Sequence, residues 1–147
     1  MATDRIESEI VINAPRDRVW AALTEAGHVA NWFGDSAEVD LRPGGRMVFG
    51  WKEYGNHYAV VERVERPGFF SYRWSHGAGV EPAAGNSTLV EFTLTPEQSA
   101  TRLRVVETGF ASLAATEEEQ ATAVKENTEG WASELRELQA YAQRLAA

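Results

Sequence analysis

Glu107 is the residue with the greatest capacity for chemistry, because it shares one side of a predicted strand with apolar residues. Leu103, Val105 and Glu107 have the same parity within residues 101–108, so their side chains are expected on one face. If that face is buried, the carboxylate needs a partner or a raised pKa, and it can anchor a ligand or act as a general base. If Glu107 instead lies at the strand end, it reaches water and has no special role.

Three histidines, His28, His57 and His76, are the other candidates for acid–base or metal chemistry. None has a second ligand at the spacing of a zinc motif. His57 and His76 are candidate partners of Glu107, and the three could hold a metal only if the fold assembles them. Because the chain contains no cysteine, thiolate metal sites, thiol catalysis and disulfides are excluded. We predict no metal and no cofactor.

Motifs of the common enzyme classes are missing from the sequence. It has no G-x-S-x-G nucleophile motif, no phosphate-binding P-loop and no G-x-G-x-x-G dinucleotide motif. Its paired and clustered glycines fall in turns and in a loop, rather than between a strand and a helix. We therefore assign no catalytic residue and keep an enzymatic function as an alternative.

Aromatic side chains mark a possible binding site. Most of them are expected to pack in the core, but a curved sheet and one helix enclose more space than their side chains fill. Small-molecule pockets are typically apolar with a few polar groups. We predict a ligand-binding site composed of Trp32, Phe33, Trp51, His57, Trp74, Glu107 and Trp131.

The elements that must position these residues follow from hydrophobic periodicity. Residues 5–13 alternate as a half-buried strand, and Pro15 suits the start of a short helix. A second short helix or turn is expected over residues 28–33. The remaining predicted strands, joined by turns such as Arg42-Pro43-Gly44-Gly45 and Pro67-Gly68, are 36–41, 46–51, 57–65, 70–74, 88–95 and 101–108.

The last third of the chain predicts one long amphipathic helix over residues 116–145. Thr116 and Glu119 have the spacing of a capping box. One face of this helix is expected to be buried and to comprise Trp131, Leu135, Leu138 and Leu145. The opposite, solvent-facing side is expected to comprise Glu134, Arg136, Glu137 and Arg144.

These elements indicate an α+β fold in a single domain over residues 1–147. The tight turns predict an antiparallel sheet, and the long helix is the only element large enough to cover one of its faces. The segment 75–87 has no apolar period and is rich in glycine, alanine and proline. Its length is typical of a lid or a mobile segment.

Charge excludes several classes of partner. The chain has 14 basic and 22 acidic residues, a net charge of -8, which argues against nucleic acid and against an anionic membrane surface. No apolar run approaches the roughly 20 residues of a membrane span, and the first residues lack a signal-peptide core. We expect a cytoplasmic protein that is a monomer or a homodimer.

Five segments together carry a family resemblance: VINAPRDRVWAALTEAGHVANWFG, PGGRMVFGW, ERVERPGFFSYRW, TLVEFTLTPEQSATRLRVVETGF and EGWASELRELQAY. In their order and spacing they resemble the START-like (SRPBCC) superfamily. The most similar group within it is the family named for the activator of the heat-shock-protein-90 ATPase, in its single-domain bacterial form. The resemblance covers residues 5–145 and implies the helix-grip fold, a curved antiparallel sheet wrapped around a long C-terminal helix.

The resemblance leaves function open, because this superfamily includes lipid carriers, cyclases, oxygenase domains and interaction modules. Our first hypothesis is the binding of a small, largely hydrophobic ligand between sheet and helix, with a role in stress response or regulation. The second is a protein-interaction module that regulates a chaperone or another protein partner. The third is a cyclase- or hydrolase-type enzyme that uses Glu107 with a histidine in the same cavity.

Overall fold

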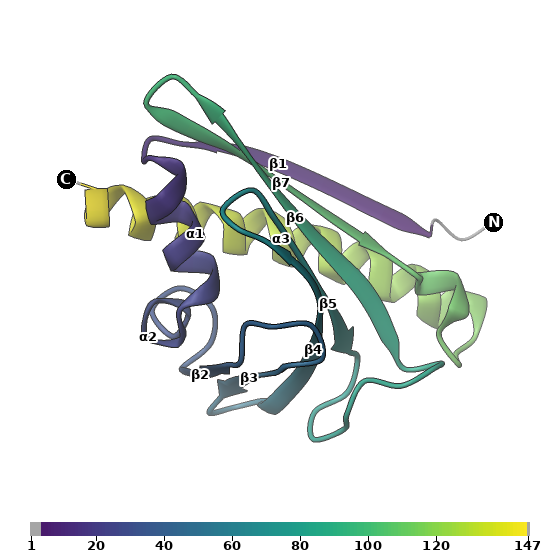
Figure 1. The fold of residues 1–147 in the computed structure, drawn as a ribbon. Helices are drawn as coiled ribbons and strands as arrows, with labels where there is room; N and C mark the ends of the chain where they lie inside the picture. The colour runs from purple at the N-terminus through teal and green to yellow at the C-terminus, as the bar shows by residue number, and fades with distance from the viewer. Residues whose placement is uncertain (1–3, 147) are drawn as a thin grey trace.

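A seven-stranded antiparallel sheet is the framework of the molecule (Figure 1). The computed structural model describes residues 4–146. The elements, in chain order, are β1 (Arg5–Ile12), α1 (Arg16–Thr24), α2 (Ala26–Val29), β2 (Ser36–Val39), β3 (Arg46–Trp51), β4 (Gly55–Glu65), β5 (Phe69–Ser75), β6 (Ser87–Glu97), β7 (Ala100–Thr108), the 3₁₀ helix η1 (Phe110–Ser112) and α3 (Glu117–Ala146).

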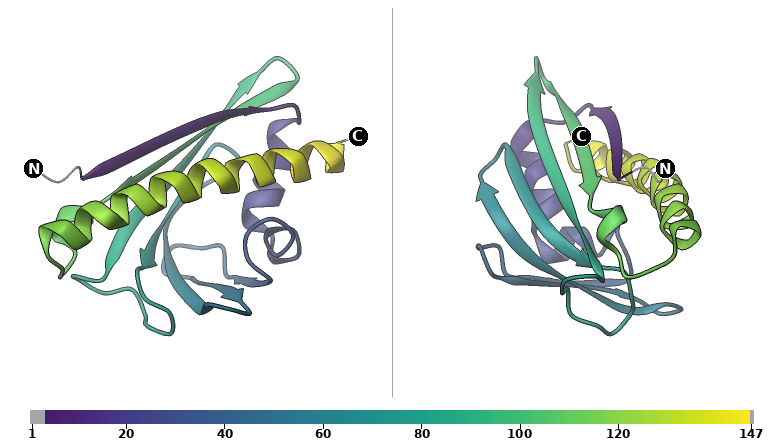
Figure 2. Two further views of the ribbon diagram at one scale, coloured as in Figure 1. Left: turned by 180° about the vertical axis from the view of Figure 1, so that it is seen from behind. Right: turned by 90° about the vertical axis from the view of Figure 1, so that its right-hand side faces the viewer.

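The strand order is β1-β7-β6-β5-β4-β3-β2, so consecutive strands are neighbours except that β1 pairs with β7. Figure 2 shows the sheet curving around one side of the long helix α3, with β1 alongside it. The short helices α1 and α2 close one end of this arrangement. The predicted helix-grip fold is confirmed.

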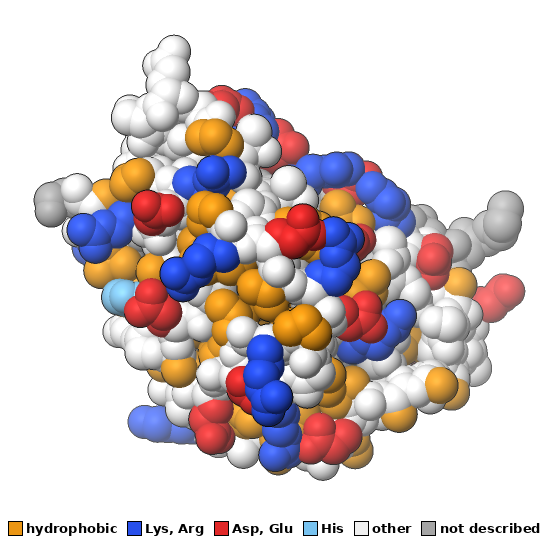
Figure 3. All heavy atoms as spheres, viewed as in Figure 1, with side chains coloured by type: hydrophobic (Ala, Val, Ile, Leu, Met, Phe, Trp, Pro, Cys, Tyr) orange, Lys and Arg blue, Asp and Glu red, His pale blue; other side chains and the backbone are white. Residues whose placement is uncertain are grey.

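Strand residues alternate between the interior and solvent as the sequence predicts. On β5, Tyr72 is buried, whereas its neighbour Arg73 forms an ion pair with Glu62 of β4 on the outer face. On the same face, Arg104 of β7 pairs with Glu7 of β1 at 2.8 Å. Figure 3, viewed as in Figure 1, shows basic and acidic side chains interspersed over this surface. Charge of both signs is therefore spread over the outer side of the sheet.

The capping box predicted for α3 is present. The backbone N–H of Thr116 donates to Oε1 of Glu119 (3.0 Å), and the backbone N–H of Glu119 donates to Oγ1 of Thr116 (3.1 Å). These bonds satisfy donors that a helix start leaves free. The buried side of α3 includes the predicted Trp131, Leu135 and Leu138, together with Ala142.

Two residues of α3 differ from the prediction. Leu145 is half-buried rather than fully packed, because it lies in the last turn of the helix. Glu134 was assigned to the solvent side, but it is half-buried and turned toward the interior. It lies three residues after Trp131, which places both side chains on one side of the helix.

The short helices hold Phe33 against the sheet. In α1, Val19, Trp20 and Leu23 are buried. The helix α2 begins at Ala26 rather than at residue 28, because Glu25 is extended and already ends α1. After it, Gly34 has a φ of +82°, and an added Cβ would lie 2.9 Å from a backbone oxygen of β3. This close turn carries the chain from α2 into β2.

The loop 76–86, between β5 and β6, is fastened at both ends. The backbone N–H of Gly79 donates to the carbonyl oxygen of Asn56 (2.8 Å). The backbone N–H of Ala114 donates to the carbonyl oxygen of Gly85 (2.7 Å). The loop contributes no side chain to the main cavity described below. In this conformation it does not cover that cavity.

Candidate functional site

A cavity of about 200 Å³ lies between the sheet and α3. Its walls come from the turn after α2, the ends of β3 and β5, the end of β7 and the middle of α3. Because Glu126 and Gly130 are exposed, the cavity opens to solvent along α3. Its lining comprises Phe33, Trp51, Trp74, Glu107, Glu126, Asn127, Gly130, Trp131 and Glu134.

Aromatic rings form the apolar walls of the cavity. The ring of Phe33 lies 5.2 Å from Trp51 in an edge-to-face arrangement, and it is parallel to Trp131 at 6.1 Å. Trp51 and Trp74 also meet edge to face, with centroids 6.2 Å apart. These separations fall in the range of favourable aromatic pairs. The rings therefore support one another around an open space instead of filling it.

Glu107 lies at the inner end of the cavity and is only 1% exposed. The indole N–H of Trp131 donates to its Oε1 at 2.9 Å. The side-chain amide of Asn127 lies 3.1 Å from both carboxylate oxygens, and the hydroxyl of Thr88 donates to Oε2 at 2.5 Å. His76 Nε2 is 3.5 Å from Oε2. The carboxylate is therefore inside the protein and does not reach water at the strand end.

The hydrogen-bond pattern also defines the protonation of His76. Its Nε2 lies 2.8 Å from the hydroxyl oxygen of Thr88. That hydroxyl has one proton, which it donates to Glu107, so it must accept from His76. The network thus assigns a proton to Nε2. Of the two histidines considered from the sequence, His76 is the one that joins Glu107.

Two opposing effects act on the pKa of Glu107. Burial is the largest single influence and raises it, but hydrogen bonds from the surrounding donors together hold it below the ordinary value of 4.5. Glu107 is therefore ionised at neutral pH. A carboxylate has about four acceptor positions, and protein donors occupy them here. We assign Glu107 to holding Trp131 and Asn127 in place, rather than to binding a ligand directly or acting as a general base.

The helix side of the cavity contains residues that the sequence analysis missed. Asn127, Gly130 and Glu134 follow one another at spacings of three and four residues, so they lie on one stripe of α3. Glu126 also belongs to the lining, and it is exposed to solvent. The helical spacing of these residues beside Trp131 was the available signal, but polar residues on a helix were interpreted as solvent-facing.

Glu134 differs from Glu107 in having a buried oxygen that receives no donor from residues 4–146. Its Oε2 is buried without a hydrogen-bond partner among residues 4–146. Burial, with a smaller contribution from the charge of Glu137, raises the pKa of Glu134 to about 7. An unpaired carboxyl group at the edge of an aromatic cavity is therefore present, and its charge varies near neutral pH.

Two of the predicted site residues do not line the cavity. Trp32 is directed between the short helices and the sheet, where its indole N–H donates to the carbonyl oxygen of Ala22 (2.7 Å). His57 stacks on Trp74, with centroids 5.4 Å apart, and burial lowers its pKa. Both residues support cavity walls. The other predicted residues, Phe33, Trp51, Trp74, Glu107 and Trp131, do line the cavity.

The described residues contain neither a cluster of metal-ligating side chains nor a membrane-spanning helix. Within residues 4–146, no group of three or more histidine, aspartate or glutamate side chains is arranged to hold a metal ion. The set His57, His76 and Glu107 is not assembled. In the same residues, no helix has both the length and the apolar composition needed to cross a membrane.

A family model described as "Activator of Hsp90 ATPase homolog 1-like protein" matches residues 13–143. Among curated proteins, none is similar enough in sequence to count as a relative.

Several solved structures share the fold. Protein MLL2253 from Mesorhizobium loti superposes with a TM-score of 0.80 at 25% identity, over 95% of this chain and 97% of that one. The Aha1 dimer from Colwellia psychrerythraea gives 0.74 at 18% identity, over 96% and 97% of the two chains. CalU16 from Micromonospora echinospora gives 0.70 at 22% identity, over 94% and 75%. The last two establish similarity of fold alone.

Proposed function

The chain belongs to the Activator of Hsp90 ATPase homolog 1-like family, and we propose that it binds a small molecule with one apolar ring in the cavity beside α3. Proteins of this START-like group typically bind hydrophobic ligands or act as cyclases. The family therefore limits the function to a class. The choice of a small ring-containing ligand rests on the cavity itself.

The observation that carries the proposal is the aromatic cavity of about 200 Å³. An apolar cavity of roughly 150 Å³ is enough to bind benzene, so this one has room for a single ring and a short substituent. It is below the roughly 300–1,000 Å³ of typical drug-sized pockets. A long acyl chain or a fused polycyclic compound would not fit without movement of α3.

A tryptophan-fluorescence titration with phenol and 2-phenylethanol tests binding. We expect saturable changes with at least one of these, because Trp51 forms part of the wall. Trp51→Phe should reduce the change. The matched control is Trp20→Phe, since Trp20 packs on Phe70 away from the cavity. If no compound binds below millimolar concentration, the proposal fails.

Filling the cavity gives a second test. Gly130 lines the cavity, and a Cβ placed there meets no atom within 4 Å. A leucine at this position should therefore enter the open space and prevent binding. Ala140→Leu is the matched control, because Ala140 is an exposed residue of the same helix. Equal binding by both variants would contradict the assigned location.

The other hypotheses from the sequence have less support. Among residues 4–146, Tyr54 and Val80 are the only exposed large hydrophobic residues, whereas a protein-docking surface usually presents a contiguous apolar patch. An enzyme that uses Glu107 as a base would need a free carboxylate oxygen, and its oxygens already accept protein donors. The cytoplasmic location and the stress role inferred from the sequence stay predictions.

A further inference from the structure

We propose that the cavity is selective for an organic cation, namely a small molecule that joins an aromatic ring to an ammonium group. This inference rests on the proposed binding function and specifies the chemical class of the ligand. It is derived from the charges around the cavity, from one unpaired carboxylate and from the faces of the surrounding rings.

The charged groups that line the cavity are all acidic. They are Glu107, Glu126 and Glu134, and no lysine or arginine belongs to the lining formed by the described residues. The whole chain also has a net charge of -8. An anionic ligand would therefore meet like charges on entry, whereas a cation would meet a favourable potential.

Glu134 is the group that lacks a counterpart. Glu107 receives donors from Trp131, Thr88 and Asn127, but Oε2 of Glu134 is buried with no donor among residues 4–146. Leaving a buried acceptor unsatisfied is unfavourable, and more so for a charged group. A ligand ammonium group would supply both the missing donor and the missing positive charge.

The aromatic walls are also suited to a cation. The π faces of tryptophan rings carry negative potential and attract an ammonium group within about 6 Å of the ring centroid. Trp51, Trp74 and Trp131 surround the same space as Glu134. The carboxylate and the rings thus favour a cationic ligand over a neutral one. A purely hydrophobic pocket would not make this distinction.

The approach to the cavity has the same charge. Glu126 and Asn127 line both the cavity and an adjoining groove, whose other walls include Glu118, Glu119 and His76. A cation that enters from this side passes acidic residues before it reaches the rings. The groove adds to the favourable potential for a cation, but it does not provide selectivity, because exposed carboxylates alone attract many cations weakly.

Three ligands with the same phenyl group and different charge distinguish selectivity for a cation from binding of any ring. Phenethylamine, 2-phenylethanol and phenylacetate are titrated by calorimetry or NMR at pH 8 and low salt, where an alkylammonium is protonated and Glu134 is largely ionised. We expect phenethylamine to bind at least fivefold more tightly than 2-phenylethanol, and phenylacetate to bind most weakly. If the alcohol binds as tightly as the amine, cation selectivity is wrong while the binding function stands. If none of the three binds, both proposals are wrong.

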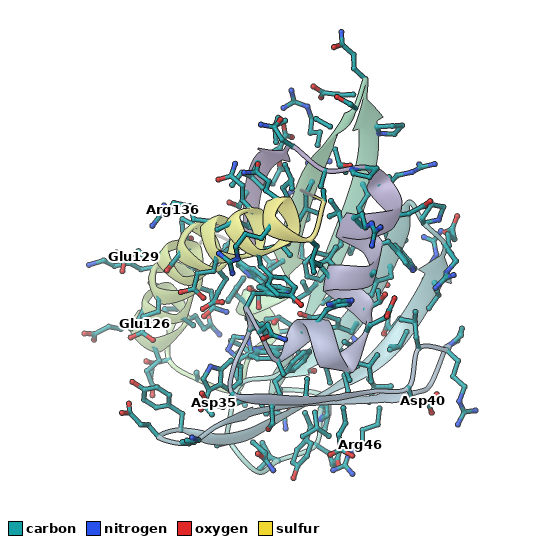
Figure 4. All side chains as sticks on the ribbon, turned by 90° about the vertical axis from the view of Figure 1, so that its left-hand side faces the viewer. Asp35, Asp40, Arg46, Glu126, Glu129 and Arg136 are labelled. Atoms are coloured by element: carbon teal, nitrogen blue, oxygen red, sulfur yellow. The ribbon has the colours of Figure 1, made fainter. Side chains whose placement is uncertain are left out.

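Glu134→Gln identifies the selective group, because it removes the charge and keeps the shape. We expect this variant to lose the preference for phenethylamine and to keep the affinity for 2-phenylethanol. Glu129→Gln is the control, since Glu129 projects from α3 away from the cavity (Figure 4). If both variants retain the preference, Glu134 is not the recognition group and the inference fails. Urea unfolding of each variant verifies that the fold is intact.

Discussion

The indole N–H of Trp131 donates a 2.9 Å hydrogen bond to Oε1 of Glu107, and this bond joins the middle of α3 to the end of β7. Both partners are buried. The bond fixes the side chain of Trp131 at the point where the helix and the sheet separate to form the cavity. The same contact therefore contributes to stability and defines one wall of the site.

Truncation of Trp131 should destabilise the protein strongly. Trp131 packs against Phe33 and Phe92, so Trp131→Ala should lower the free energy of unfolding by about 3–5 kcal/mol. Trp131→Phe should have a smaller effect, but a larger one than Trp20→Phe. The reason is that the indole N–H of Trp20 has no partner in residues 4–146. Urea denaturation measures all three, and an unchanged midpoint for Trp131→Ala would contradict the assignment.

Glu107→Gln should destabilise the folded state by about 1–3 kcal/mol. The reason is that the amide NH₂ of glutamine takes the place of one carboxylate oxygen, so that a donor faces side chains that are themselves donors. The variant should also change how the free energy of unfolding depends on pH under acidic conditions. The pKa of Glu107 is below 4.5 in the folded protein, so its contribution is present above pH 4.5 and is lost as the pH falls through the folded pKa. Glu91→Gln, on the outer face of β6, is the control. Equal losses in the two variants would refute the interior role.

Titration of Glu134 should change stability with pH in the direction opposite to that of Glu107. Its pKa is raised to about 7 in the folded protein, so the unfolded chain releases this proton between about pH 4.5 and 7 while the folded chain retains it. The contribution of Glu134 is then most favourable below pH 4.5 and decreases as the pH rises to 7. Thermal melts at pH 5, 6, 7 and 8 should show this decrease in the parent protein and a flatter profile in Glu134→Gln. The same profile in both proteins would show that Glu134 titrates normally.

Gly130→Ala should stabilise the protein and weaken ligand binding. Glycine within a helix is less favourable than alanine by about 0.5–1 kcal/mol, and the added Cβ meets no atom within 4 Å. The methyl group would, however, project into the cavity. Gly27→Ala in α2 is the control, because its Cβ also meets open space but does not reach the cavity. A Gly130→Ala variant that binds as well as the parent would show that this space is not used.

The loop 76–86 should exchange its amide hydrogens faster than the flanking strands. It has no apolar period, and few of its backbone groups bond outside the loop beyond Gly79, which bonds to Asn56 of β4, and Gly85, which bonds to Ala114 before α3. Hydrogen exchange followed by NMR tests this, with β5 and β6 as internal references. Protection throughout the loop equal to that of these strands would contradict the expected mobility.

Alternating patterns in the sequence were sufficient to orient the strand residues of the site. Trp51 and Trp74 lie on the inner face with the apolar residues that share their parity, and Glu107 follows Leu103 and Val105 inward. The period of a strand is two, so a single well-placed apolar neighbour determines the face. The pattern left burial of the carboxylate open, because a residue near a strand end can also reach water. Its saturation by donors could not be predicted, because those donors come from three other segments.

The helix and turn residues of the site were harder to predict. Phe33 and Trp32 are adjacent in a turn, where no period applies, and only Phe33 reaches the cavity. Glu134 was placed in solvent, because a charged helix residue is usually exposed. Its actual position depends on where α3 leaves the sheet. That separation is set by packing between distant elements and has no local signature.

The pairing of β1 with β7 has a consequence for how the chain is synthesised. Arg5 lies opposite Thr108, so the first strand of the sheet to be synthesised pairs with the last. Contacts so distant in sequence form slowly. Until β7 and α3 have emerged, the apolar side chains of Ile6 and Ile12 have nothing to cover them. Completion of this sheet therefore requires β7, and a nascent chain stalled before β7 would expose an unpaired, partly apolar β1 to chaperones or to other nascent chains.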